Sequence, residues 1–118
     1  MITEFILLHI LIIHYLLDFG LQTNKQAENK SSDIKQLSYH VLIYSMFWVI
    51  CTLHIFNDVR ISLSFGIITF VCHFVTDFFT SRISRVYFEN KDYHNGFVVV
   101  GFDQILHYLQ LYFTFKSL

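Results

Sequence analysis

Three segments of the chain each carry a histidine and an aspartate four positions apart. The pairs are His14 with Asp18, His73 with Asp77, and Asp103 with His107. Positions i and i+4 lie on one face of an α-helix, so each segment can present both side chains to one ion or substrate. The HExxH metal-binding motif uses the same spacing, and mixed histidine and carboxylate ligands suit zinc, manganese or iron. These residues therefore indicate metal-dependent chemistry.

Four apolar stretches must position the pairs, and each is close to the ~20 residues that a membrane-spanning helix needs. They cover residues 2–21, 37–56, 61–80 and 97–115. Hydrophobic residues make up 54% of the chain and charged residues only 14%, against roughly 25% charged in ordinary soluble domains. We therefore predict a single domain over residues 1–118, an all-α integral membrane four-helix bundle. The first stretch lacks a positively charged start, which favours a retained span over a signal peptide.

Lysine and arginine gather in the connections that follow the first and third stretches. They are Lys25, Lys30, Lys35, Arg82, Arg85 and Lys91. Cytoplasmic loops of membrane proteins carry an excess of these residues. We therefore predict a multi-pass protein of the inner (cytoplasmic) membrane with its first and third connections in the cytoplasm. The net charge of −1 and the lack of a basic stripe argue against nucleic acid as a partner.

Depth along the predicted spans points to one site. In antiparallel spans, all three pairs and His40 lie in the leaflet that faces the basic connections. An aspartate inside a span costs about 2.5–3.5 kcal/mol, so three cost roughly 8–10 kcal/mol, which a zinc ion that returns on the order of 10 kcal/mol can offset. We predict that seven residues hold divalent metal. They are His14, Asp18, His40, His73, Asp77, Asp103 and His107.

Seven candidate ligands exceed the three or four of one tetrahedral zinc. The set fits two zinc ions that share a carboxylate, or one zinc whose histidines are oriented by aspartates; manganese and iron are alternatives. We expect Asp77 and Asp103 to be catalytic. Gln22, Tyr44 and Ser81 continue the same helix faces, so we expect them to support the ligands, although polar packing between helices explains them equally well.

The polar motifs resemble those of the DUF3307 family, small bacterial and phage membrane proteins of unknown function. The resemblance lies in HYLLDFGLQTNKQAENK, the His40 that follows, HFVTDFFTSR and FDQILHYLQL, and covers nearly the whole chain. It also marks Gln104, expected to support the ligands, and Lys30, expected beside a substrate. The family is distantly similar to membrane-bound metal-dependent hydrolases, which implies a hydrolytic reaction.

Two functions remain open. The first is a metal-dependent hydrolase of a lipid or lipid-linked phosphoester at the cytoplasmic face, with Lys25, Arg82 and Arg85 at the mouth of the site to hold phosphate. The second is a non-enzymatic protein, phage-encoded and acting on a host membrane, that binds metal or handles ions or protons. It requires a polar path through the other leaflet, which is mainly apolar. Ser62 and Gly66 form a small-xxx-small pair, which indicates a homodimer.

Overall fold

A computed structural model describes residues 3–118, and it contains helices and no strand within that range. The elements are α1 (Glu4–Tyr15), a π-helical turn η1 (Leu16–Gly20), α2 (Asn24–Asn29), α3 (Ile34–Phe56), α4 (Val59–Glu89) and α5 (Tyr93–Ser117). The all-α prediction is confirmed. The helix of the third predicted stretch continues through Arg82 and Arg85, which the sequence analysis put in the connection, and ends at Glu89.

Two helices, α3 and α4, are long and apolar enough to cross a membrane, with a mean hydropathy of 1.6 over their best windows. The sequence predicted four such spans. The first predicted span, residues 2–21, is only partly α-helical. Its α-helix α1 has 12 residues, and the backbone then widens into the π-helical turn η1. The helix α5 has 25 residues, but Asp103, Gln104 and His107 lower its hydropathy.

The connections follow from local side-chain chemistry. Asn57 ends α3 in the left-handed conformation at φ 52°, and the Asp58 carboxylate then accepts hydrogen bonds from the backbone N–H groups of Arg60 and Ile61 at the start of α4. The helix α2 was not predicted. It begins with a capping box between Thr23 and Gln26, in which each side chain satisfies a backbone N–H of the first turn.

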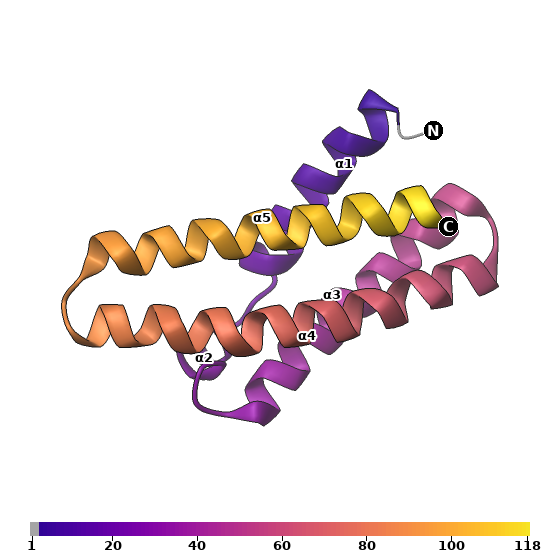
Figure 1. Ribbon diagram of the computed structural model, residues 1–118. Helices are drawn as coiled ribbons and strands as arrows, with labels where there is room; N and C mark the ends of the chain where they lie inside the picture. The colour runs from indigo at the N-terminus through magenta and orange to yellow at the C-terminus, as the bar shows by residue number, and fades with distance from the viewer. Residues whose placement is uncertain (1–2) are drawn as a thin grey trace.

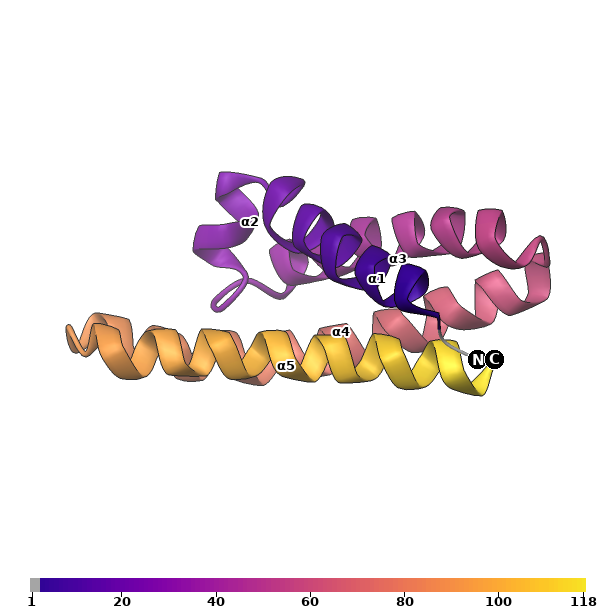
Figure 2. The same ribbon diagram turned by 90° about the horizontal axis from the view of Figure 1, so that it is seen from above.

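The helices form two layers (Figures 1 and 2). The helices α4 and α5 lie side by side, and α1, α2 and α3 lie on one face of the layer that they form. Within this arrangement α3 packs along α4, and α1 crosses α5 at an angle. The α4–α5 turn and α2 lie at one end of the molecule, whereas the α3–α4 turn and the end of α5 lie at the other. The basic connections therefore share one end.

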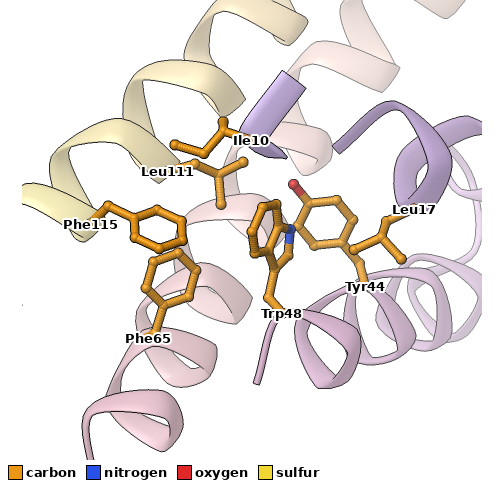
Figure 3. Packing of buried hydrophobic residues seen from close by; sticks show 7 residues of the cluster. All are labelled: Ile10, Leu17, Tyr44, Trp48, Phe65, Leu111 and Phe115. Carbon is orange, nitrogen blue, oxygen red and sulfur yellow. The ribbon is translucent and has the colours of Figure 1, made fainter. Parts of the chain in front are cut away.

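The interior is more polar than the surface. Among the described residues, buried polar and charged side chains outnumber buried hydrophobic ones, while leucine, isoleucine, valine and phenylalanine dominate the exposed surface. Seven of the buried apolar residues form one cluster around Trp48, shown in Figure 3, with Tyr44 at one side. Its members are Ile10, Leu17, Tyr44, Trp48, Phe65, Leu111 and Phe115. In a water-soluble domain most fully buried side chains are hydrophobic.

The small-xxx-small pair of Ser62 and Gly66 lies at the contact between α4 and α3 within one chain. Ser62 and Gly66 are both buried, and a Cβ atom added to Gly66 would overlap Cγ2 of Val49 on α3. The absence of a side chain at Gly66 therefore allows α3 and α4 to approach closely. This packing explains the motif without a second copy of the chain.

We predict that Gly66→Ala destabilises the protein by about 1–3 kcal/mol, because Val49 must move to admit the methyl group. Gly101→Ala is the matched control, since a Cβ atom there meets nothing within 4 Å and alanine favours a helix over glycine by up to about 1 kcal/mol. Unfolding of both variants in detergent, followed by circular dichroism, measures the difference. Equal stability of the two variants would contradict the packing argument.

Candidate metal centre

Residues from four elements meet in the half of the bundle nearest the basic connections. They form two groups of potential ligands that share Asp77. The four-ligand group consists of Asp18, His40, His73 and Asp77, and the three-ligand group consists of Asp77, Asp103 and His107. All six side chains are buried. The π-helical turn carries Asp18, α3 carries His40, α4 carries His73 and Asp77, and α5 carries the other two.

The four-ligand group has the dimensions of a tetrahedral metal site. The atoms that converge are Oδ1 of Asp18, Oδ2 of Asp77 and the Nε2 atoms of His40 and His73. Five of the six separations between them run from 3.0 to 3.5 Å. Zinc bonds of about 2.0–2.1 Å place the ligand atoms of a tetrahedron roughly 3.3 Å apart. The side chains present in this group therefore fit a zinc-sized ion.

His107 is oriented by a backbone carbonyl. Its Nδ1 lies 2.7 Å from the carbonyl oxygen of Asp103, so Nδ1–H donates there and the lone pair of the neutral ring is left on Nε2. That Nε2 atom lies 3.3 Å from Oδ1 of Asp77, and both atoms are buried without a hydrogen-bond partner. Two acceptors at this distance repel each other unless a proton or a cation lies between them.

The structure does not bring His14 into either group. Its Nε2 lies 2.7 Å from Oε1 of Gln104 and its Nδ1 lies 2.6 Å from the Tyr44 hydroxyl. Since the amide oxygen accepts, His14 carries its proton on Nε2 and accepts a hydrogen bond from Tyr44 on Nδ1. Asp18, on the π-helical turn, pairs with His40, whereas His14, on α1, bonds to Gln104 of α5 and keeps its Nε2 3.7 Å from Oδ2 of Asp18.

Gln104 links the two groups. Its amide nitrogen lies 3.1 Å from Oδ2 of Asp18 and 3.0 Å from Oδ2 of Asp103, so it donates to one carboxylate of each group. The other oxygen of Asp103 accepts from the Thr80 hydroxyl. Sequence analysis missed Thr80, although it lies three positions after Asp77 on the same face of α4, because buried threonines in apolar helices commonly bond to their own backbone.

Lys30 reaches the ligands from the connection between α2 and α3. Its Nζ atom lies 3.1 Å from Oδ2 of Asp77, and only 19% of its side chain is exposed. Burial alone would lower the pKa of Lys30, but the carboxylates of Asp77 and Asp18 outweigh it and hold the pKa above its usual value. The ammonium group therefore stays charged and balances part of the carboxylate charge.

A cleft of about 530 Å³ adjoins both groups. It reaches the carboxylates of Asp18, Asp77 and Asp103. The remaining lining residues are Phe19, Gln22, Ala27, Glu28, Lys30, Ser31, Thr80, Ser81, Ser84, Arg85, Phe88, Glu89, Val100 and Gln104. Buried oxygen atoms of Gln22 and Ser81 have no hydrogen-bond partner. The cleft is therefore open to a ligand with polar and apolar parts.

Of the four cations expected beside a substrate, the structure brings two to the cleft. Lys30 and Arg85 line it, whereas Lys25 and Arg82 do not. Arg82 instead donates to the carbonyl oxygen of Phe78 and stacks on that ring at 3.7 Å. The other three histidines, His9, His54 and His94, are outside both groups.

Comparison with known proteins adds one finding. The family model described as "Protein of unknown function (DUF3307)" matches residues 6–117. No curated protein and no solved structure matches the chain.

Proposed function

The chain belongs to the DUF3307 family of proteins of unknown function, and from its buried site we propose that it is a membrane-embedded, metal-dependent hydrolase of lipid or lipid-linked phosphoesters. The observation that carries the proposal is the near-tetrahedral spacing of the four-ligand group at the wall of a mixed polar and apolar cleft. Three further observations support it. They are the apolar surface, the common end at which the basic connections lie, and the buried Nε2 of His107 and Oδ1 of Asp77, which have no hydrogen-bond partner.

The membrane assignment is supported by the distribution of side chains. Exposed leucine, isoleucine and phenylalanine extend along every long helix, while aspartate, histidine and threonine face inward. Exposed apolar areas of this extent are unfavourable in water and ordinary in lipid. If all four apolar segments span the membrane, α2 and the α4–α5 turn, which lie at the same end of the molecule, are on one side of it, and the positive-inside rule favours the cytoplasm for that side.

The metal assignment is supported by charge as well as spacing. Asp18, Asp77 and Asp103 are buried carboxylates, and Lys30 is the one ammonium group beside them among the described residues. With the histidines neutral, the form in which they bind metal, the three carboxylates and one ammonium leave a net charge of −2. Buried charge that is left uncompensated costs several kcal/mol. Divalent cations would compensate this negative charge.

The reaction is hydrolysis of a phosphoester. A bound metal ion would lower the pKa of a water molecule toward 7 and polarise the phosphoryl group. Water forms the new P–O bond, the ester P–O bond breaks, and the proton that water loses ends on the leaving oxygen. Asp77 and Asp103 line the cleft and can hold the metal or accept that proton, in keeping with the roles expected of them.

The cleft favours an amphipathic substrate. Lys30 and Arg85, the latter also paired with Glu89 at 3.3 Å, offer positive charge to a phosphate group. Phe19, Phe88 and Val100 offer apolar surface to a chain. A cleft at the cytoplasmic end of the bundle would meet lipid headgroups at the membrane surface. We therefore favour a phospholipid or a lipid-linked phosphate over a soluble phosphoester.

The test uses protein purified in detergent and dialysed against zinc. We expect bound metal by elemental analysis, release of phosphate from phosphatidic acid in mixed micelles, loss of that activity with EDTA, and recovery with zinc. His73→Ala is expected to lose metal and at least about 100-fold in rate, because supporting residues alone cost 10–100-fold. His54→Ala, on an exposed part of α3, is the matched control and should behave as wild type.

Two outcomes would overturn the proposal. A wild-type protein without bound metal would remove the metal site. Bound metal without any release of phosphate would remove the hydrolase and leave the alternative, a non-enzymatic metal-binding or ion-handling protein. The apolar cluster beside the site argues against an ion path, because Trp48, Phe65 and Leu111 are fully buried there (Figure 3). Zinc-driven flux into vesicles should therefore stay at background.

A further inference from the structure

Asp77 faces two different places with its two carboxylate oxygens. Oδ2 lies 3.3 Å from Nε2 of His73 and 3.5 Å from Nε2 of His40, in the four-ligand group. Oδ1 lies 3.3 Å from Nε2 of His107, in the three-ligand group. A single carboxylate can therefore contact two ions, one through each oxygen. Bridging carboxylates of this kind recur where two metals lie about 3.5–4 Å apart.

The three-ligand group has unpaired atoms that point into it. Nε2 of His107 and Oδ1 of Asp77 have no hydrogen-bond partner, and both side chains are only 1% exposed. The backbone carbonyl of Asp103 holds the His107 ring in the orientation that directs the Nε2 lone pair inward. Histidines that ligate metals are typically held in this way through their other nitrogen.

The two groups differ in the number of coordination positions that the protein leaves without a ligand. The four-ligand group supplies four protein atoms, which completes a tetrahedral coordination shell, whereas the three-ligand group supplies three. Structural zinc sites are closed by four protein ligands, and catalytic sites keep one position for water or substrate. Asp77 and Asp103 of the three-ligand group also line the cleft.

We propose that the protein holds two metal ions bridged by Asp77, and that the ion in the three-ligand group is the one that binds water and substrate. This inference rests on the proposed hydrolase. The ion in the four-ligand group joins η1, α3 and α4 and is not replaced during turnover. Gln104 is a positioning residue, because it donates to Asp18 of one group and Asp103 of the other.

Charge then indicates the class of phosphoester. The buried net charge of −2 left by three carboxylates and Lys30 becomes +2 when two divalent ions are bound, and the more exposed Arg85 and Glu89 pair with each other at 3.3 Å. A phosphate monoester carries about −1.5 to −2 at pH 7, so it balances the loaded site, whereas a phosphodiester carries only one negative charge. The substrate is therefore a phosphomonoester, and the product of an earlier step that leaves a terminal phosphate on a lipid would supply it.

The experiment counts metals and measures their coupling. Detergent-purified protein is dialysed against manganese, and bound metal is determined by elemental analysis and by electron paramagnetic resonance. We expect two ions for each chain and an exchange-coupled spectrum, since bridged ions lie close together. His107→Ala and the isosteric Asp103→Asn should each retain one uncoupled ion and lose at least 100-fold in phosphate release. His94→Ala, outside both groups, should retain two coupled ions.

The outcomes separate this inference from the proposed function. One ion for each wild-type chain, with metal-dependent hydrolysis intact, would overturn the second site and leave the hydrolase standing. Two uncoupled ions would overturn the bridge through Asp77. Equal rates on phosphatidic acid and on its phosphodiester counterparts would overturn the assignment of a monoester. Loss of the four-ligand ion in His107→Ala would also contradict the division of roles.

Discussion

Replacement of Asp77 by Asn is expected to empty the site of metal. Asp77 is the one residue that both ligand groups contain, so a neutral amide there removes a ligand from each. Loss of a residue that merely supports a ligand costs about 10–100-fold in metal affinity, and loss of a shared ligand must cost more. We expect no retained metal after dialysis and phosphate release at the level of the buffer. The volume of the side chain is unchanged, so the helices should still pack.

Asp58→Asn makes the same chemical change outside the site. Asp58 caps α4 through its side chain, and asparagine caps helices about as well as aspartate. This variant should bind metal and release phosphate as wild type does. If Asp77→Asn kept a full complement of metal, neither the four-ligand nor the three-ligand group could be the metal site. Elemental analysis of the two proteins side by side gives the answer.

Lys30→Met is expected to act in opposite directions on stability and on metal affinity. In metal-free protein, Lys30 is the cation that faces Asp77 at 3.1 Å. Removal of one partner from a buried ion pair costs about 3–5 kcal/mol, because the other charge is left uncompensated. With metal present, the same ammonium repels the incoming ion. Its removal should therefore raise the affinity for zinc by at least about 10-fold, given the strength of charge interactions at such distances.

Two measurements separate these effects. Denaturant unfolding in detergent with EDTA reports the loss of stability, and competition with a chromophoric chelator reports the gain in zinc affinity. Lys25→Met, an exposed lysine of α2 outside the cleft, is the control and should change neither quantity. If Lys30→Met lowered the affinity for zinc, the ammonium group would not repel the bound ion, and charge balance with Asp77 would not be the role of Lys30.

Much of the helical framework was predictable because helix formation is local. Apolar stretches of spanning length predicted the long helices, and the i, i+4 spacing placed His73 with Asp77 and Asp103 with His107 on common faces, where the structure has them. The small helix α2 escaped prediction because six residues in a polar connection carry no apolar period. The capping box formed by Thr23 and Gln26 is the one local signal in the sequence that indicates the start of this helix.

The sequence by itself indicated the types of the candidate ligands, the helices that carry them and their common depth, because each depends on composition and on the period of one helix. Only the tertiary structure decided which atoms meet. Asp18 on the π-helical turn meets His40, His14 on α1 meets Gln104, and the path of the α2–α3 connection brings Lys30 to Asp77. Such pairings depend on how neighbouring helices rotate and cross. Lys30 and Asp77 are 47 positions apart, and no local pattern in the sequence indicates a contact between residues so far apart.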